Sequence, residues 1–442
     1  MRFCIARRFA ALFVAILFSA AATSYGQARQ PAPPEANGLR AAPESRTATP
    51  LARLIEEAEH ANPSISAAQQ AWRAAKQVPS QVSTLPDPQL VVQQFAVGSP
   101  RPFAGFSNSN FAYVGFGISQ DLPYPGKLRL RGRIAERSAG AAEEKIDAVG
   151  REVDEQVRST YFRLGEVQET LGIEQRDRKL LNEIEKIAEA RYRVGQGGQQ
   201  EVLKAQLEQT RILADLAEQQ REKSSLEARL KQLLNRAPES LDLTARPLTE
   251  TPLRWTADEL LHAVAAGNPD ARMQQEIVRR QDVEVALARS DFYPDFNVQC
   301  MWQHTASQFR DYYMLSFGVR VPLYRKRRQD PELAERLDDL ASSRQQYEAA
   351  VQQDYFSVRD AFLDARTDDQ VLKIYREGLI PQATAGLNAG LAAYQQSRED
   401  FETLINSFLD VLHLDEEYWR ALADHETALA RLEALTGLKV FH

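Results

Sequence analysis

Two histidines and two glutamates near the C-terminus are the residues best suited by type to bind a metal ion. They are His413, Glu416, Glu417 and His425, in the stretch "HLDEEYWRALADHE". Imidazole and carboxylate groups are common zinc ligands. The stretch has the spacing of a helix, however, so we interpret the four residues as a solvated helix face. The chain also lacks Gly-x-Ser-x-Gly, phosphate-loop and Cys-x-x-Cys motifs, so we predict no enzyme, no cofactor and no metal site.

Two short turns carry the other informative residues. "YRVGQGGQQEVLKAQ" (192–206) and "YQQSREDFETLINS" (394–407) each join two long helical segments. Glycine tolerates a left-handed backbone, so we expect Gly195, Gly197 and Gly198 to form a tight turn. Ser397 takes the place of the first glycine in the second turn, which predicts a looser turn or a different contact there.

The elements that position these turns occur twice. Asn62-Pro63 recurs as Asn268-Pro269, "PDP" recurs as "YPD", and Tyr192 recurs as Tyr394, all about 200 residues apart. Such spacing indicates a tandem duplication. The expected units are 51–240 (strand pair 86–124, tip 192–200) and 257–442 (strand pair 292–324, tip 394–402), joined by a linker at 241–256.

The strand pairs alternate apolar residues with small or polar ones. One face of each strand is expected to carry the apolar residues, which are Val114, Phe116, Ile118 and Leu122, then Phe296, Val298, Cys300 and Trp302, then Leu315, Phe317, Val319 and Val321. The other face is expected to carry Tyr113, Gly115, Gly117 and Ser119, then Asn297, Gln299 and Gln303, then Ser316, Gly318 and Arg320. This pattern is typical of a half-buried sheet or a membrane barrel. The first strand alternates poorly and predicts no facing. Tyrosines at the strand ends (124, 312, 313 and 324) lie where an interfacial aromatic girdle would fall. We interpret Cys300 as a small packing residue.

The intervening segments have the spacing of coiled coils. Val351, Tyr355, Val358, Phe362 and Ala365 are separated by four and three residues, as are Leu404, Phe408 and Val411, and also Leu226, Leu230 and Leu233. We expect a long proline-free helix in each copy, the first of about 90 Å. An ordinary helical-bundle core is the alternative, but it leaves the recurring strand pairs unexplained.

The N-terminus and the charge limit the class of protein. Residues 1–28 have the arginines, apolar run and small residues of a signal peptide, and 29–50 form a Pro/Ala-rich extended segment. Cys4 precedes the apolar run, so we expect no lipid anchor. The net charge of −7 argues against a nucleic-acid partner.

Basic clusters follow the second strand of each pair. They comprise Lys127, Arg129, Arg131 and Arg133, then Arg325, Lys326, Arg327 and Arg328. Because each cluster lies where strand passes into helix, we expect either contact with anionic lipid headgroups or a solvated collar.

Four strands cannot close a membrane barrel, since known barrels have at least about 8 strands and open edges in lipid are costly. One chain therefore implies a homo-oligomer. A dimer would supply 8 strands and a trimer 12, and the trimer would leave the wider lumen.

The order of these motifs resembles TolC-like outer-membrane efflux proteins over about residues 50–437. The resemblance rests on the signal peptide, the duplication, "NP", "PDP", "QDLPYPGK" and "YRVGQ…EVLKAQ". It implies a mostly α-helical trimer whose chains share a 12-stranded outer-membrane barrel and a periplasmic α-barrel. It also implies a passive efflux duct, with a periplasmic adaptor and an inner-membrane pump, expected to be proton-driven, as partners. "QDLPYPGKLRLR" is most similar to the heavy-metal and cation branch.

The resemblance also assigns roles at the tips. Tyr192 and Gly195 match positions that dock the adaptor, and the alternative is that they only shape the turn. The acidic ring of well-known members would fall at Thr403 and Asn406, which are not acidic. An acidic mouth would therefore be displaced, and the candidates for it are Glu201, Glu399, Asp400 and Glu402. The alternative is that these residues only form a solvated, charged tip.

A periplasmic coiled-coil adaptor or scaffold without a pore is the rival function. An adaptor would have a single hairpin and soluble β modules rather than two copies with amphipathic strand pairs. A scaffold would need neither the alternating strands nor the tyrosines.

Overall fold

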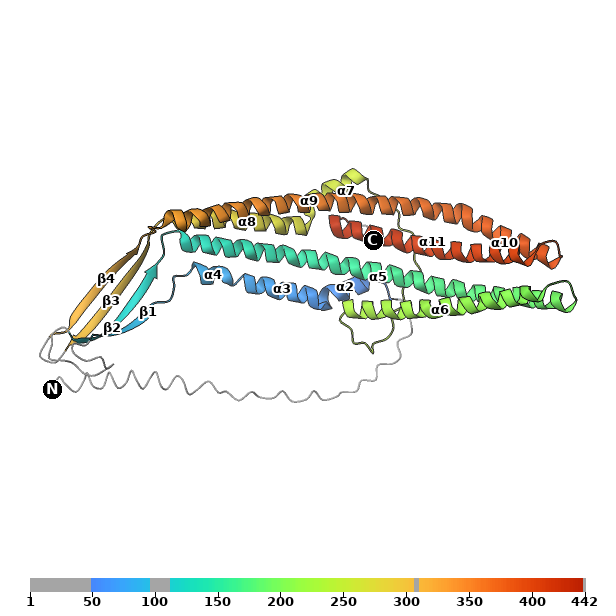
Figure 1. Ribbon diagram of the computed structural model, residues 1–442, viewed down its shortest axis with the longest axis horizontal. Coiled ribbons are helices and arrows are strands. Elements are labelled where there is room, and N and C mark those ends of the chain that lie inside the picture. Colours follow the sequence, from blue (N-terminus) through green and yellow to red (C-terminus); the bar gives the residue numbers. More distant parts are fainter. Residues whose placement is uncertain (1–48, 96–111, 306–309, 440–442) are drawn as a thin grey trace, which may run out of the picture. The chain divides into compact units, whose positions relative to one another are not determined.

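The computed structural model describes residues 49–95, 112–305 and 310–439 (Figure 1). The predicted signal peptide and nearly all of the 29–50 segment lie outside these residues. Residues 96–111 and 306–309, which join the two strands of each pair, lie outside them as well.

The four strands form one antiparallel sheet in the order β1-β2-β3-β4. They are β1 (Gln89–Phe95), β2 (Tyr113–Leu122), β3 (Asp295–Thr305) and β4 (Tyr312–Arg320). The first repeat supplies β1 and β2, the second supplies β3 and β4, and β2 pairs with β3 across the repeat boundary. In the described residues, the outer edges of β1 and β4 have no strand partner.

Each repeat builds the same series of helices around its strand pair. The first has α2 (Leu51–Ala61), α3 (Pro63–Ala75), α4 (Val78–Ser83), α5 (Lys127–Arg193) and α6 (Gln199–Leu233). The second has α7 (Ala257–Gly267), α8 (Pro269–Ser290), η1 (Arg325–Arg327), α9 (Gln329–Ile374), η2 (Tyr375–Leu379), α10 (Ile380–Gln395) and α11 (Phe401–Thr436).

The Asn-Pro pair starts the second short helix in each repeat by the same device. Proline occupies the first helical turn, where its missing N–H is not needed. The preceding asparagine caps the helix: Ser64 N donates to Asn62 Oδ1 at 2.8 Å, and Asp270 N donates to Asn268 Oδ1 at 2.9 Å.

The second long helix differs from the first. The expectation of a proline-free helix holds for α5, which runs unbroken over 67 residues. It is wrong for the second repeat, which contains Pro381. Because proline cannot donate within the helix, the ladder loosens before it into the π-helical turn η2 (Tyr375–Leu379).

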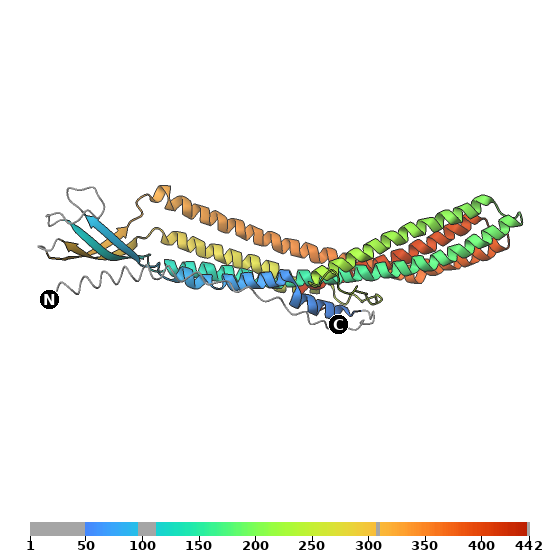
Figure 2. The same cartoon turned by 90° about the horizontal axis from the view of Figure 1, so that it is seen from below.

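The helices are held by seams of apolar side chains. α5 packs on α6, α8 and α11, and α11 also packs on α9 (Figure 2). The predicted coiled-coil residues lie in these seams: Val358, Phe362, Ala365, Leu404, Phe408, Leu230 and Leu233 are buried. The linker adds Leu243, Ala245 and Leu248 to the cluster that contains Leu230 and Leu233.

Candidate functional site

The sheet has one apolar and one polar face. Cross-strand partners share a face, and the register aligns Leu90, Ile118, Cys300 and Leu315 in one row. The neighbouring row contains Val92, Phe116, Trp302 and Tyr313. Most of these side chains are exposed, with Leu90 and Tyr313 each 81% accessible. The predicted facing of β2, β3 and β4 is confirmed, and the register supplies that of β1.

The opposite face carries small and polar residues. One row contains Gln89, Ser119, Gln299 and Ser316. In the next row, the backbone leaves no room for a side chain at Gly117, because a Cβ there would lie 2.6 Å from the carbonyl oxygen of Cys300 and 3.0 Å from Met301 Cβ. Cys300 itself is exposed on the apolar face, so its interpretation as a packing residue is wrong for the single chain.

Lys127 does not belong to an exposed basic cluster. Its side chain is buried, and its Nζ lies 2.9 Å from both Asp291 Oδ1 and Asp295 Oδ1. Tyr124 N also donates to Asp295, at 2.8 Å. Burial alone would lower the pKa of Lys127, but the two aspartates raise it overall. Lys127 therefore links the two repeats by ion pairs at the place where the strands meet the helices. Its ammonium group is buried and does not contact lipid.

The remaining basic residues stay accessible. The exposed members are Arg129, Arg131, Arg133, Arg325, Lys326, Arg327 and Arg328. Tyr324 is exposed beside the second cluster, and Tyr124 stacks on Tyr293 with ring centroids 4.5 Å apart.

The two tips have the same backbone turn. Gly195 has φ +76° and Ser397 has φ +61°, both in the left-handed region. Gly195 N donates to Tyr192 O, and Ser397 N donates to Tyr394 O, each at 3.0 Å. The expectation of a looser second turn is wrong, because serine adopts the conformation despite its cost. Gly197 and Gly198 do not need positive φ.

A cluster of polar bonds fastens the two tips together within one chain. Tyr394 Oη donates to Glu201 Oε2 at 2.6 Å, and Glu201 also accepts from Gly198 N. The Arg191 guanidinium lies 4.1 Å from the Tyr394 ring centroid and donates to the Tyr394 carbonyl oxygen. Lys204 pairs with Glu402. Burial and the Glu201 carboxylate raise the pKa of Tyr394.

Among the other acidic-mouth candidates, Asp400 has a local structural role. Asp400 caps α11 by accepting from Thr403 N at 2.7 Å, and this bond lowers the pKa of Asp400. Thr403 and Asn406 are exposed, and Glu399 is half-buried. Sequence reasoning missed Arg191 and Lys204, since only the contact between the hairpins shows their roles.

Gly195→Ala is expected to lower the stability of the first tip by about 1–2 kcal/mol, because an L-residue is strained at φ +76°. Ser397→Gly should have no such cost, since it removes the strain that serine already carries. Hydrogen exchange of the tip amides would measure both, and equal effects of the two changes would contradict the expectation.

The "HLDEEYWRALADHE" stretch is not a uniformly solvated face. His413 and Glu417 are exposed, but His425 is fully buried. Its ring nitrogens lie 2.9 Å from the Ala365 carbonyl oxygen and 2.8 Å from that of Thr251. These contacts place the linker against α9 and α11. Within the described parts of the chain, no group of three or more His, Cys, Asp or Glu residues is arranged to hold a metal ion.

Carboxylates also gather where α5, α6 and α11 meet. Glu174 is 2% exposed and faces Glu416 and Asp215. Burial, then the charges of these two neighbours, raises the pKa of Glu174 to about 7. Burial also raises the pKa of Glu416.

No helix among residues 49–95, 112–305 and 310–439 combines the length and apolarity needed to cross a membrane.

Comparison with known proteins gives a family match over part of the chain and a fold for nearly all of it. Residues 54–236 match the family described as outer membrane efflux protein. No curated protein matches the chain. Three solved structures superpose with probability 1.00. The outer membrane protein VceC of Vibrio cholerae is 17% identical, with a TM-score of 0.73 and coverage of 87% of this chain and 96% of that one.

The other two structures are outer membrane channels. CmeC of Campylobacter jejuni is 14% identical, with a TM-score of 0.71 and coverage of 93% of this chain and 94% of that one. The open state of MtrE from Neisseria gonorrhoeae is 19% identical, with a TM-score of 0.71 and 88% coverage of both chains.

Proposed function

We propose that this chain is a TolC-like outer membrane efflux protein and supplies one third of a homotrimeric duct with a shared 12-stranded barrel. The match of residues 54–236 to the family described as outer membrane efflux protein supports a passive channel rather than an enzyme. The observation that supports the shared barrel best is the four-stranded sheet, which has an exposed apolar face and, among the described residues, two edges without a strand partner. Lipid penalises an open edge, and pairing β1 of one copy with β4 of the next removes it.

The helices support the same assembly. In the chain, α8 packs between α5 and α9, and α11 packs on both of these long helices. Their first-repeat counterparts, α3 and α6, pack mainly on α5. A second copy that places its α9 beside α3 and α6 would repeat the internal contact. Such head-to-tail contacts generate a closed ring when the rotation closes.

Three copies fit a duct better than two. Two copies would give a barrel of 8 strands, and side chains fill the interior of a barrel of that size. Three leave a lumen lined by the glycines, serines and glutamines of the polar face. The mass of the detergent-purified protein tests this proposal, and a trimer is expected. A water-soluble monomer would contradict it and would favour the rival function, a periplasmic adaptor or scaffold without a pore.

We propose that the tips form the periplasmic mouth and dock a periplasmic adaptor linked to an inner-membrane pump. Tyr192 is exposed at the first tip, where a partner could reach it. The turns at Gly195 and Ser397 present the same backbone, so both hairpins can offer a similar surface. Cargo from the heavy-metal and cation class remains a prediction.

Tyr394→Phe is expected to open the mouth more often. It removes a hydrogen bond to the Glu201 carboxylate, which would contribute about 1.5 kcal/mol, or roughly tenfold in the population of separated tips. Single-channel recording should show a larger mean conductance. Tyr192→Phe is the matched control, because Tyr192 is exposed at the other tip; an equal increase there would contradict the role of the bond.

We propose that the exposed arginines beside the sheet contact anionic lipid headgroups. Neutralising Arg129, Arg131, Arg325 and Arg327 together is expected to reduce insertion of the assembled protein into anionic vesicles and to leave insertion into neutral vesicles unchanged. Unchanged insertion into both would favour a solvated collar.

A further inference from the structure

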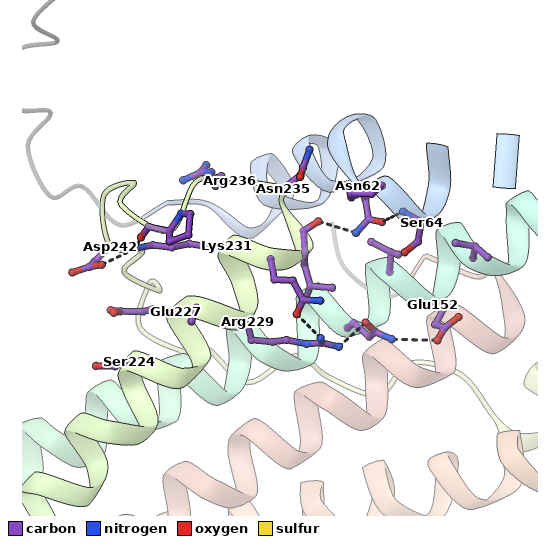
Figure 3. Close-up of a pocket in the computed structure, with 18 residues that line it drawn as sticks. Asn62, Ser64, Glu152, Ser224, Glu227, Arg229, Lys231, Asn235, Arg236 and Asp242 are labelled. Atoms are coloured by element: carbon purple, nitrogen blue, oxygen red, sulfur yellow. Dashed lines mark hydrogen bonds and ion pairs between the residues drawn. The ribbon is translucent and has the colours of Figure 1, made fainter. Parts of the chain in front are cut away.

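A cavity with a volume of about 980 Å³ lies where α3, α5 and α6 meet. Figure 3 shows Asn62 and Ser64 on one side of it and Arg229 and Lys231 along α6. From α5, Val149 and Val153 supply apolar lining.

A smaller cavity of about 220 Å³ occupies the matching place in the second repeat. The repeats align well here, because both outgoing helices end at a left-handed residue, Asn235 and Gly437. The six equivalent lining residues are Asn62, Pro63, Ser64, Arg229, Gln232 and Leu233 in the first cavity, and Asn268, Pro269, Asp270, Arg431, Ala434 and Leu435 in the second.

The second cavity is small because the long helix of the other repeat fills it. Four residues of α5 line it: Ala148, Arg151, Glu152 and Glu155. Arg151 Nη1 donates to the Ala434 carbonyl oxygen at 3.3 Å. Burial raises the pKa of Glu155, and the nearby charge of Arg431 partly offsets this rise. The first cavity has no such helix from a neighbouring repeat in the described chain.

The equivalent residues of α9 are found by shifting α5 by 201 positions. The shift is supported by buried pairs along the two helices, which are Ala139 and Leu340, Val157 and Val358, Tyr161 and Phe362, and Leu164 and Ala365. It maps the four cavity-filling residues of α5 onto Ala349, Gln352, Gln353 and Phe356. All four are exposed, and Phe356 is 60% accessible.

We infer that α9 of a second copy of this chain enters the large cavity, with Phe356 as its apolar anchor. This inference rests on the proposed homotrimer and names the residues that join its copies. Phe356 would meet Val149, Val153 and Leu233, and its ring would be within reach of Arg229, as Glu155 is of Arg431. Gln352 would donate to the Gln232 carbonyl oxygen, as Arg151 donates to that of Ala434.

Cross-linking tests the contact directly. In a cysteine-free background (Cys4→Ser and Cys300→Ser), Gln232→Cys and Gln352→Cys are combined, and the detergent-purified protein is treated with a short bismaleimide. Covalent dimers and trimers are expected on a denaturing gel. The control pair, Gln220→Cys with Gln352→Cys, is displaced by 12 residues, or about 18 Å along α6, and should not cross-link between chains.

The oligomeric mass of the same samples separates the two hypotheses. A trimer by mass that gives no intermolecular cross-link would overturn the Phe356 contact and leave the trimer intact. A monomer by mass would overturn both. Cross-linking of the two pairs to equal extents would also overturn the contact.

Substitution of the anchor gives a second readout. Phe356→Ala is expected to weaken association by at least about tenfold for each interface, because a buried aromatic side chain is lost. Phe356→Leu, which retains most of the apolar area, should stay within about threefold of the original. Equal dissociation of the original protein and the alanine variant on dilution in detergent would contradict the anchor.

Discussion

Lys127→Met is expected to lower the free energy of unfolding by about 3 kcal/mol. The ammonium is buried and lies 2.9 Å from two carboxylates, on Asp291 and Asp295, which come from the second repeat. Removing one partner of a buried ion pair typically costs about 3–5 kcal/mol. The lower end applies because both aspartates are partly exposed, at 32% and 30%.

Chemical denaturation followed by tryptophan fluorescence would measure the loss. Arg129→Met is the matched control, since Arg129 lies two residues along the same helix and is exposed. It should change the free energy of unfolding by less than about 0.5 kcal/mol. Equal destabilisation by the two substitutions would show that Lys127 is a solvated basic residue like Arg129 and not a buried ion-pair partner.

The contact between α5, α6 and α11 is expected to loosen as the pH rises toward neutrality. With these helices packed, the pKa of Glu174 is about 7, and with them separated it would return to 4.5. The packed state therefore binds more protons between these values. Its advantage is fully present below about pH 4.5 and is lost as the pH rises to about 7, by at most about 3 kcal/mol.

Glu174→Gln should remove this dependence, because the amide stays neutral and nearly isosteric. Hydrogen exchange of the α11 amides near Glu416, corrected for intrinsic rates, would be compared at roughly pH 5 and pH 8. The original protein should lose protection and the variant should keep it. Glu143→Gln, at an exposed site on α5, is the control. A pH dependence that survives in Glu174→Gln would place its source elsewhere.

The parts of the fold that follow a local period could be predicted from the sequence. Alternation in β2, β3 and β4 predicted the correct faces, because successive side chains of a strand point to opposite faces of the sheet. The seam at Val358, Phe362 and Ala365 was visible for the same reason. The facing of β1 was not, since its apolar and polar residues do not alternate and only pairing with β2 fixes it.

The errors concern residues whose partners are far away in the chain. Lys127 was grouped with neighbouring arginines, but its partners are more than 160 residues away. The sequence places His425 on a solvated face, but its ring is buried in contact with the linker and α9. Ser397 shows a different limit: the turn is imposed by the hairpin, so serine accepts a backbone that sequence reasoning reserves for glycine.

Single-channel recording across a planar bilayer is the most direct test of the efflux duct. We expect the purified oligomer to insert and produce discrete, long-lived conductance steps, as an open lumen requires. An oligomer of the correct mass that inserts but carries no current, even with Tyr394→Phe in the tips, would contradict the account of a continuous duct.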